Sequence, residues 1–210
     1  MITTVAKVDR LNPDPSVISE AGRIIKSGGL VAFPTETVYG LGADALNPEA
    51  VRKIYEAKER PPEKALILHV DGISQAEKYV ELNDAALKLM MKFWPGPLTF
   101  VLPARDTVPL ITRAGLPTAA VRMPDDAIAQ ALISSVGSPI AAPSANLSGR
   151  PSPIDAEMVY NDMAGRIDMI IDGGSVKLGT PSTIIDATQP ERISLLRLGT
   201  WRFEEIIKAL

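Results

Sequence analysis

The chain has 210 residues, of which 46% are hydrophobic and 22% are charged, which is typical of a globular domain rather than a disordered segment. Its 22 basic and 25 acidic side chains give a formal net charge of −3, so the overall basic field of many nucleic-acid-binding domains is excluded, although a local basic groove is not. The absence of cysteine excludes disulfides, thiolate nucleophiles and Cys-rich zinc sites, and a single histidine, His69, disfavours a His-based metal cluster or a conventional Ser-His-Asp triad.

Helical and extended patterns alternate along the chain. Apolar residues three and four apart predict helices over residues 16–27, 47–58, 83–94, 200–210 and near 125–135 and 154–164. The expected N-caps are Ser16, Asn47, Asn83 and Thr200. Short apolar runs predict strands over residues 29–33, 65–70, 97–102, 118–123, 139–143, 168–174, 182–186 and 193–198.

These elements predict a single α/β domain with a twisted sheet flanked by helices. The sheet should mix parallel and antiparallel strands, because several later strands are joined by turns too short for a parallel crossover. The N-terminus has no apolar stretch after a charged segment, and no run of about 18 apolar residues occurs. We therefore expect a soluble cytoplasmic protein that does not contact a membrane.

Residues 33–42, FPTETVYGLG, place hydroxyls, a carboxylate and two glycines at the end of a predicted strand. This stretch alone is compatible with a phosphate-binding loop, a substrate cradle or a simple turn. Thr35 and Thr37 should share one side of an extended chain, whereas Glu36 should point away from them, so we assign Glu36 no role.

The segment AKERPPEK follows the second predicted helix, and its prolines end that helix. If residues 58–60 are extended, Lys58 and Arg60 point to the same side, and such a pair of cations suits a polyphosphate. The alternative is a charged loop exposed to solvent. In PSAN, Ser144 and Asn146 place a hydroxyl and an amide two residues apart, which fits either an anion site or a turn.

Arg122 lies in an otherwise apolar strand, where a buried charge needs a partner. A ligand carboxylate would suit its planar fork, and an internal Asp or Glu would serve as well. His69 ends an apolar strand and could donate to a substrate, although a lone histidine is more often a structural residue. No protein ligands for a metal are evident, but Mg²⁺ brought by a nucleotide would need only one or two carboxylates.

Together these side chains favour catalysis by positioning and charge stabilisation, as in nucleotidyl or phosphoryl transfer, over covalent catalysis. No P-loop motif is present. The residue chemistry by itself therefore indicates an anion site that suits a nucleotide.

The ordered motifs FPTETVYGLGADA, KIYEAKERP, FWPGPLTFVL, VRMPD, APSANLSG, DGG, STIIDAT and LLRLG resemble the YrdC family of threonylcarbamoyl-AMP synthases over about residues 10–205. The resemblance implies one YrdC-like domain over residues 1–210, without the second C-terminal domain of longer relatives. It also implies that L-threonine, bicarbonate and ATP, with Mg²⁺ and no organic cofactor, form threonylcarbamoyl-AMP and pyrophosphate. The product would pass to a partner ligase that modifies tRNA.

By position, the resemblance implies two groups of binding residues. The threonine site falls on Thr35, Thr37, His69, Arg122, Ser144 and Ser182. The ATP site falls on Lys58, Arg60, Lys64, Thr118, Asn146, Ser152, Ile154 and Arg197. Lys58, Arg60, Ser144 and Asn146 are the expected catalytic residues. On this reading residues 33–42 form the wall of an amino-acid pocket, and Tyr39 packs rather than reacts.

Several positions depart from the pattern of relatives, among them LRLG, which stands in place of the more usual Arg-Pro-Gly. Glu59 stands where many have glycine, Lys64 begins a pair that is often Asn-Pro, and Ile154 replaces a common threonine. Two other functions remain open on sequence alone. One is a module that binds double-stranded RNA or tRNA through the same basic residues. The other is an ATP-dependent carbamoyltransferase that acts on a different amine.

Overall fold

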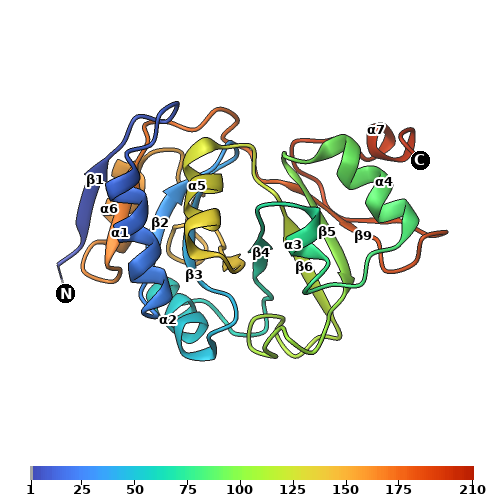
Figure 1. Cartoon of the computed structure of the whole chain (residues 1–210), viewed down its shortest axis with the longest axis horizontal. Helices are drawn as coiled ribbons and strands as arrows, with labels where there is room; N and C mark the ends of the chain where they lie inside the picture. The colour runs from blue at the N-terminus through green and yellow to red at the C-terminus, as the bar shows by residue number, and fades with distance from the viewer. Residues whose placement is uncertain (1) are drawn as a thin grey trace.

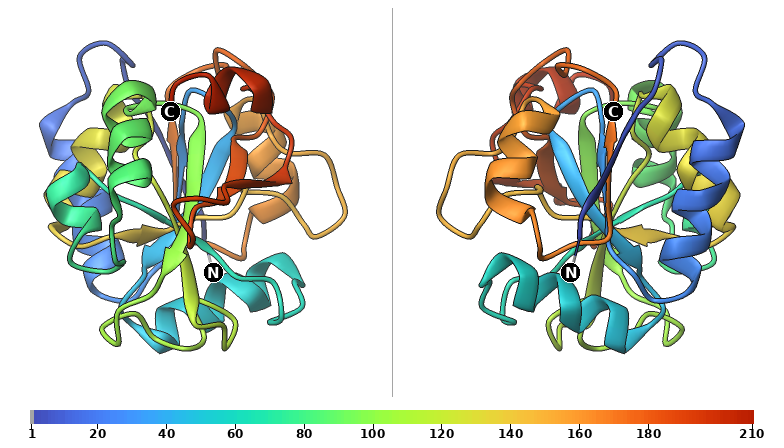
Figure 2. Two further views of the ribbon diagram at one scale, coloured as in Figure 1. Left: turned by 90° about the vertical axis from the view of Figure 1, so that its right-hand side faces the viewer. Right: turned by 90° about the vertical axis from the view of Figure 1, so that its left-hand side faces the viewer.

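The computed structural model describes residues 2–210, and its centre is a mixed sheet with helices on both faces (Figures 1 and 2). In this part of the chain the strands are β1 Thr4–Lys7, β2 Val31–Pro34, β3 Tyr39–Asp44, β4 Ile67–His69, β5 Leu98–Pro103, β6 Thr118–Arg122, β7 Ile140–Ala141, β8 Met169–Asp172, β9 Thr183–Asp186 and β10 Ser194–Arg197. The helices are α1 Pro15–Lys26, α2 Pro48–Lys58, α3 Ile73–Ala76, α4 Asp84–Phe93, α5 Ala127–Val136, α6 Ala156–Met163 and α7 Phe203–Ile207.

The strand order is β1-β8-β2-β3-β7-β4-β6-β5-β9-β10, with both parallel and antiparallel pairs. Figure 2 shows α1, α4 and α5 on one side of the sheet and α6 and α7 on the other. The predicted α/β class and mixed sheet are therefore confirmed. In the described residues no helix combines the length and apolar character that crossing a bilayer requires.

Local signals explain most helix boundaries. Asn47 accepts hydrogen bonds from the amides of Glu49 and Ala50 at the start of α2, as expected of an N-cap. The predicted cap Ser16 is wrong: Asp14 caps α1, because Pro15 fixes the first helical turn and Ser16 already lies inside it.

The last helix was also expected to begin earlier than it does. Thr200 was predicted to cap it, but α7 begins at Phe203 and its N-cap is Arg202. The Thr200 hydroxyl instead donates to the carbonyls of Thr180 and Pro181, 3.4 Å from each. Thr200 therefore attaches the chain to the segment before β9 rather than starting a helix.

Residues 33–42 are a β-hairpin and not the end of a single strand. β2 and β3 pair antiparallel, with Phe33 opposite Gly40, and residues 35–38 form the turn between them. The glycines of GLG therefore lie inside a strand. A Cβ at Gly42 would come within 2.8 Å of the side chains of Ile140 and Phe33, so glycine is needed there for close packing rather than for turning.

Two features of the sheet position the candidate site. β4 and β6 run parallel, and their register places His69 directly opposite Arg122 at the ends of these strands. β10 forms one edge of the sheet and pairs only with β9, and all four of its residues are exposed. Arg197 is the last residue of that edge strand.

Candidate active site

A cavity of about 220 Å³ lies where the β2–β3 turn approaches β4, β6 and the loop after β7. Side chains from both halves of the chain line it. Nine residues predicted from the sequence are among them, namely Thr35, Thr37, Arg60, His69, Arg122, Ser144, Ser152, Ser182 and Arg197. The structure therefore brings most of the predicted site residues to one place.

The hydroxyls of Thr35 and Thr37 lie 2.8 Å apart and are both buried. The Thr35 hydroxyl donates its proton to the carbonyl of Val38 at 2.7 Å, so the Thr37 hydroxyl must be the donor between the two threonines. Thr37 Oγ1 also accepts from Arg122 Nη1 at 3.0 Å. The turn is thus held by its own hydrogen bonds, and Thr37 orients the guanidinium of Arg122.

Arg122 is fixed by three groups of the protein. Its Nε donates to the Gly96 carbonyl at 3.3 Å, Nη1 donates to Thr37, and Nη2 lies 2.6 Å from Glu36 Oε1. Both side chains of the ion pair are only 4% exposed. Of the two partners expected for Arg122, the protein therefore supplies the internal acid.

Glu36, to which the sequence assigns no role, is therefore the partner of Arg122. The tight turn brings its carboxylate to β6. A buried arginine in an apolar strand was the signal that one of the few nearby acids had to pair with it.

His69 is buried, and its Nδ1 has no hydrogen-bond partner. Burial, followed by the positive charge of Arg122, lowers the pKa of His69 to about 3. The imidazole is therefore neutral at physiological pH. It can offer one N–H and one acceptor nitrogen to a ligand in the cavity, without adding positive charge.

Lys58 does not form the predicted extended pair with Arg60. It is the last residue of α2, and Glu59 follows in the left-handed conformation with φ 51° and ψ 42°. The Lys58 ammonium is buried and donates to the carbonyls of Ser144 and Asn146. Burial and the nearby charge of Arg60 lower the pKa of Lys58 to about 7. Lys58 thus ties α2 to the Ser144–Asn146 loop behind the cavity wall.

Arg60 and Arg197 are the other two guanidinium groups at the cavity. Arg60 Nη2 donates to the carbonyls of Lys64 and Ala65, and its buried Nε has no partner. Arg197 Nη2 donates to the Ser182 carbonyl at 2.8 Å and to the Ser182 hydroxyl at 3.1 Å. Burial and the positive charges of Arg122 and Arg60 lower the pKa of Arg197, as expected where three cations converge.

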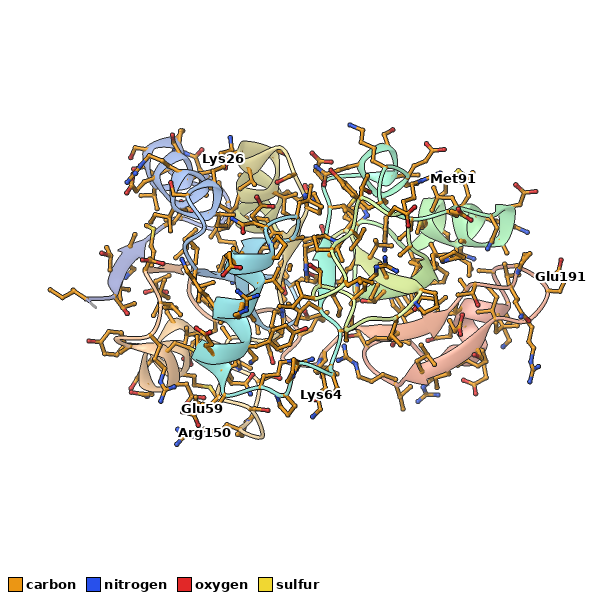
Figure 3. The ribbon with its side chains drawn as sticks, turned by 90° about the horizontal axis from the view of Figure 1, so that it is seen from below. Lys26, Glu59, Lys64, Met91, Arg150 and Glu191 are labelled. Atoms are coloured by element: carbon orange, nitrogen blue, oxygen red, sulfur yellow. The ribbon has the colours of Figure 1, made fainter. Side chains whose placement is uncertain are left out.

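Five predicted residues do not line this cavity: Lys58, Lys64, Thr118, Asn146 and Ile154. Asn146 donates to the carbonyls of Leu147 and Arg150, which shapes the loop after β7. Lys64 is exposed on the segment between α2 and β4, as Figure 3 shows, and Ile154 is 41% exposed. Their assignment to an ATP site remains a prediction.

Tyr39 is part of the packing, as predicted. Its ring is fully buried, its hydroxyl donates to the Gly174 carbonyl at 2.7 Å, and it accepts from the Gly173 amide. Burial raises the pKa of Tyr39 well above its usual value. The tyrosine therefore joins β3 to the loop after β8 and has no free hydroxyl proton for a ligand.

Comparison with known proteins gives consistent matches. A model of the Sua5/YciO/YrdC family, described as telomere recombination, matches residues 23–199. A threonylcarbamoyl-AMP synthase of Pyrococcus abyssi is 50% identical over 191 residues, covering 90% of this chain and 56% of that protein. A Bacillus subtilis protein of the same name is 48% identical over 200 residues, covering 94% and 58% respectively.

The solved structures agree with these matches. The crystal structure of P. abyssi Sua5 complexed with L-threonine superposes with a TM-score of 0.96 at 47% identity, covering 99% of this chain and 61% of that one. This chain therefore spans little more than half the length of the curated relatives that it matches.

Proposed function

Because the chain belongs to the Sua5/YciO/YrdC family, whose model matches residues 23–199, we propose that it is an L-threonylcarbamoyladenylate synthase. In the proposed reaction L-threonine, bicarbonate or CO₂, and ATP give threonylcarbamoyl-AMP and pyrophosphate. The curated relatives named threonylcarbamoyl-AMP synthase and the relative solved with L-threonine support this proposal.

The observation that carries the proposal is the arrangement of polar groups in the cavity. Arg122 and neutral His69 lie opposite each other across two adjacent strands, with the two threonines of the β2–β3 turn beside them. This part suits an amino acid, because it combines a guanidinium with hydroxyl groups and an uncharged imidazole. Arg60 and Arg197 reach the same cavity from other elements and suit phosphate oxygens.

In this proposal, Arg122 binds the carboxylate of threonine with guanidinium N–H groups that make no hydrogen bond to the protein. Two of its five N–H groups donate to Gly96 and Thr37, and Nη2 is held near Glu36 by an ion pair. Threonine's amine attacks the carbon of bicarbonate, and water leaves to give a carbamate. A carbamate oxygen then attacks the α-phosphorus of ATP, and pyrophosphate departs.

The chain's own residues act here by binding and charge stabilisation. Arg60 and Arg197 would neutralise charge on the departing pyrophosphate, and Lys58 would hold the Ser144–Asn146 loop in position. Within residues 2–210 there is no group of three or more Asp, Glu or His side chains that could hold a metal ion. We therefore propose that Mg²⁺ arrives with the phosphates of ATP, whose negative charge it would reduce.

The proposed product is an activated carbamoyl group. A ligase would transfer it to tRNA in the cytoplasm, giving threonylcarbamoyladenosine beside the anticodon. Direct contact with tRNA or double-stranded RNA is the alternative use of the basic residues. Affinity for RNA that falls steeply with salt and is indifferent to ATP and threonine would favour that alternative.

The test is a pyrophosphate-release assay with ATP, Mg²⁺, bicarbonate and single amino acids. We expect release that requires both threonine and bicarbonate, with serine and valine as poor substrates, since only a site that fits both the methyl and the hydroxyl rejects both. Release that does not depend on threonine contradicts the proposed substrate. Equal rates with another amine would instead identify a different carbamoyltransferase.

A further inference from the structure

Glu36 lies behind the cavity rather than in it. Its neighbours Thr35 and Thr37 line the cavity, whereas Glu36 is not among the lining residues and its carboxylate pairs with Arg122. The turn holds it there, because the Glu36 carbonyl accepts from the Leu178 amide at 2.9 Å and the side chain is buried. The side-chain contact that links Glu36 to the cavity is therefore its ion pair with Arg122.

The three guanidinium groups at the cavity are not equivalent in charge. Arg122 has a carboxylate 2.6 Å away. Arg60 and Arg197 donate only to carbonyl and hydroxyl oxygens, and within residues 2–210 neither has an acidic group at ion-pair distance. One side of the cavity is therefore close to electrically neutral, and the other carries two uncompensated positive charges.

We infer that Glu36 is a specificity-determining residue that assigns the two substrates to different parts of the cavity, an inference that rests on the proposed function. A zwitterionic amino acid fits the neutralised Arg122, because its single carboxylate needs two N–H donors and little net charge. A polyanionic phosphate gains more from Arg60 and Arg197, whose charges no protein carboxylate offsets. Without Glu36, Arg122 would become a third full cation, and phosphate would compete with threonine for it.

The test is calorimetric titration of L-threonine into the full chain, with and without inorganic phosphate at constant ionic strength. In the wild type, we expect phosphate to leave the threonine affinity essentially unchanged. In Glu36→Gln, phosphate should weaken the apparent threonine affinity by about tenfold or more, as one new charge-assisted hydrogen bond to phosphate would cause. A loss of packing alone would not create competition by phosphate.

Asp126→Asn is the matched control. Asp126 is also a buried acid, but its ion pair is with Arg10, 3.5 Å away. It caps α5 by accepting from the amides of Ile128 and Ala129, and asparagine preserves that cap. Asp126→Asn should bind threonine without competition by phosphate. Equal phosphate sensitivity in this control would overturn the inference, because any buried acid would then have the same effect.

Because Glu36→Gln leaves a buried cation unpaired, Glu36→Asp provides a second variant. It keeps the charge on a shorter side chain that cannot hold the same contact, so competition by phosphate should be intermediate. If phosphate does not compete with threonine in any folded Glu36 variant, the inference is contradicted. If the wild type does not bind threonine, the proposed function fails, yet direct phosphate titration should still show tighter binding to the Glu36 variants than to the wild type.

Discussion

His69 shows how burial sets the charge of a single side chain. The pKa of His69 falls to about 3 because the imidazole is buried beside Arg122. In the unfolded chain His69 takes up a proton as the pH falls below its ordinary pKa of 6.5, whereas in the folded protein it stays neutral to a much lower pH. This residue's contribution to stability is complete above pH 6.5 and decreases as the pH falls from there towards 3.

Replacing His69 with glutamine should remove that part of the acid sensitivity. The free energy of unfolding of the wild type should fall between pH 7 and 5 by roughly 1–2 kcal/mol more than that of His69→Gln, since each pH unit is worth about 1.4 kcal/mol per proton. Urea unfolding at both pH values measures the difference. Parallel pH dependence in the two proteins would show that His69 titrates normally.

Arg60 offers a test of the phosphate side of the cavity. Its protein contacts are two hydrogen bonds of 3.3 Å to carbonyls, so its removal should cost little stability. Arg60→Ala should lower kcat/KM in the pyrophosphate-release assay by at least ~10-fold, because a charged hydrogen bond to phosphate is worth about 1.5–3 kcal/mol. Arg52→Ala, which removes an exposed arginine of α2, is the control and should keep full activity. An active Arg60→Ala enzyme would show that this guanidinium does not contact ATP.

At the level of secondary structure, the C-cap of α2 is Glu59, one of the positions at which the sequence departs from the family pattern. Glu59 stands where the family pattern has glycine, as the resemblance implies, and it occupies the left-handed conformation with φ 51°. A side chain in this conformation costs roughly 1–2 kcal/mol. The Glu59 side chain forms an exposed ion pair with Arg166 at 2.9 Å, and this ion pair offsets only a small part of that cost.

Glu59→Gly should therefore raise the melting temperature by a few degrees, corresponding to about 0.5–1 kcal/mol. Glu59→Ala is the matched control, because it removes the same ion pair but keeps a Cβ in the left-handed conformation. It should be no more stable than the wild type. A scanning-calorimetry result in which alanine stabilises as much as glycine would rule out backbone strain as the cause.

The β2–β3 hairpin gives a second prediction at this level. A Cβ at Gly42 would lie 2.8 Å from two buried side chains, whereas a Cβ at Gly72 would meet no atom within 4 Å. Gly42→Ala should lower the free energy of unfolding by about 1–3 kcal/mol through overpacking, and Gly72→Ala should change it by less than about 0.5 kcal/mol. Chemical denaturation of both variants makes the comparison. Similar stability of the two would mean that the hairpin can move to accept a methyl group.

The same elements show what the sequence could and could not predict. Helix α2 and its Asn47 cap follow from local spacing, because the side chain that caps the helix is next to it in the chain. The hairpin was missed because its turn, TETV, contains no glycine, while the glycines lie inside β3 for packing reasons. The predicted direction of the Lys58 side chain is wrong because Lys58 is still helical. Glu59, in the left-handed conformation, turns the chain before the prolines are reached.

For the whole molecule, the position of a side chain depends on contacts far apart in sequence. The pairing of Glu36 with Arg122 spans 86 positions, the difference between their residue numbers, and no local pattern specifies it. The resemblance to a known family assigned residues from distant motifs to binding sites, and nine of them line one cavity in the structure. Residue chemistry alone reached only an anion site, because the distances between motifs are set by the sheet.

Ligand binding should stabilise the whole fold, because the cavity joins strands from both halves of the chain. Threonine at about 100 times its Kd should add about 2.7 kcal/mol to the free energy of unfolding. In a thermal-shift measurement this predicts a rise of roughly 5–10 °C for a chain of this size. Serine at the same concentration should give a much smaller rise. Equal shifts would indicate that the pocket does not recognise the methyl group.

The volume of the cavity and the exposure of β10 have a joint consequence for substrate exchange. About 220 Å³ lies below the range of roughly 300–1,000 Å³ usual for sites that enclose a nucleotide-sized ligand. A nucleotide bound as proposed would therefore extend past the rim, where Arg197 lies on a strand that is hydrogen-bonded to one neighbour only. The amides of β10 should exchange with deuterium sooner than those of the central strands, and bound ATP should slow them. On the proposed function, product would then leave past this exposed edge strand, away from His69 and Arg122 at the ends of β4 and β6.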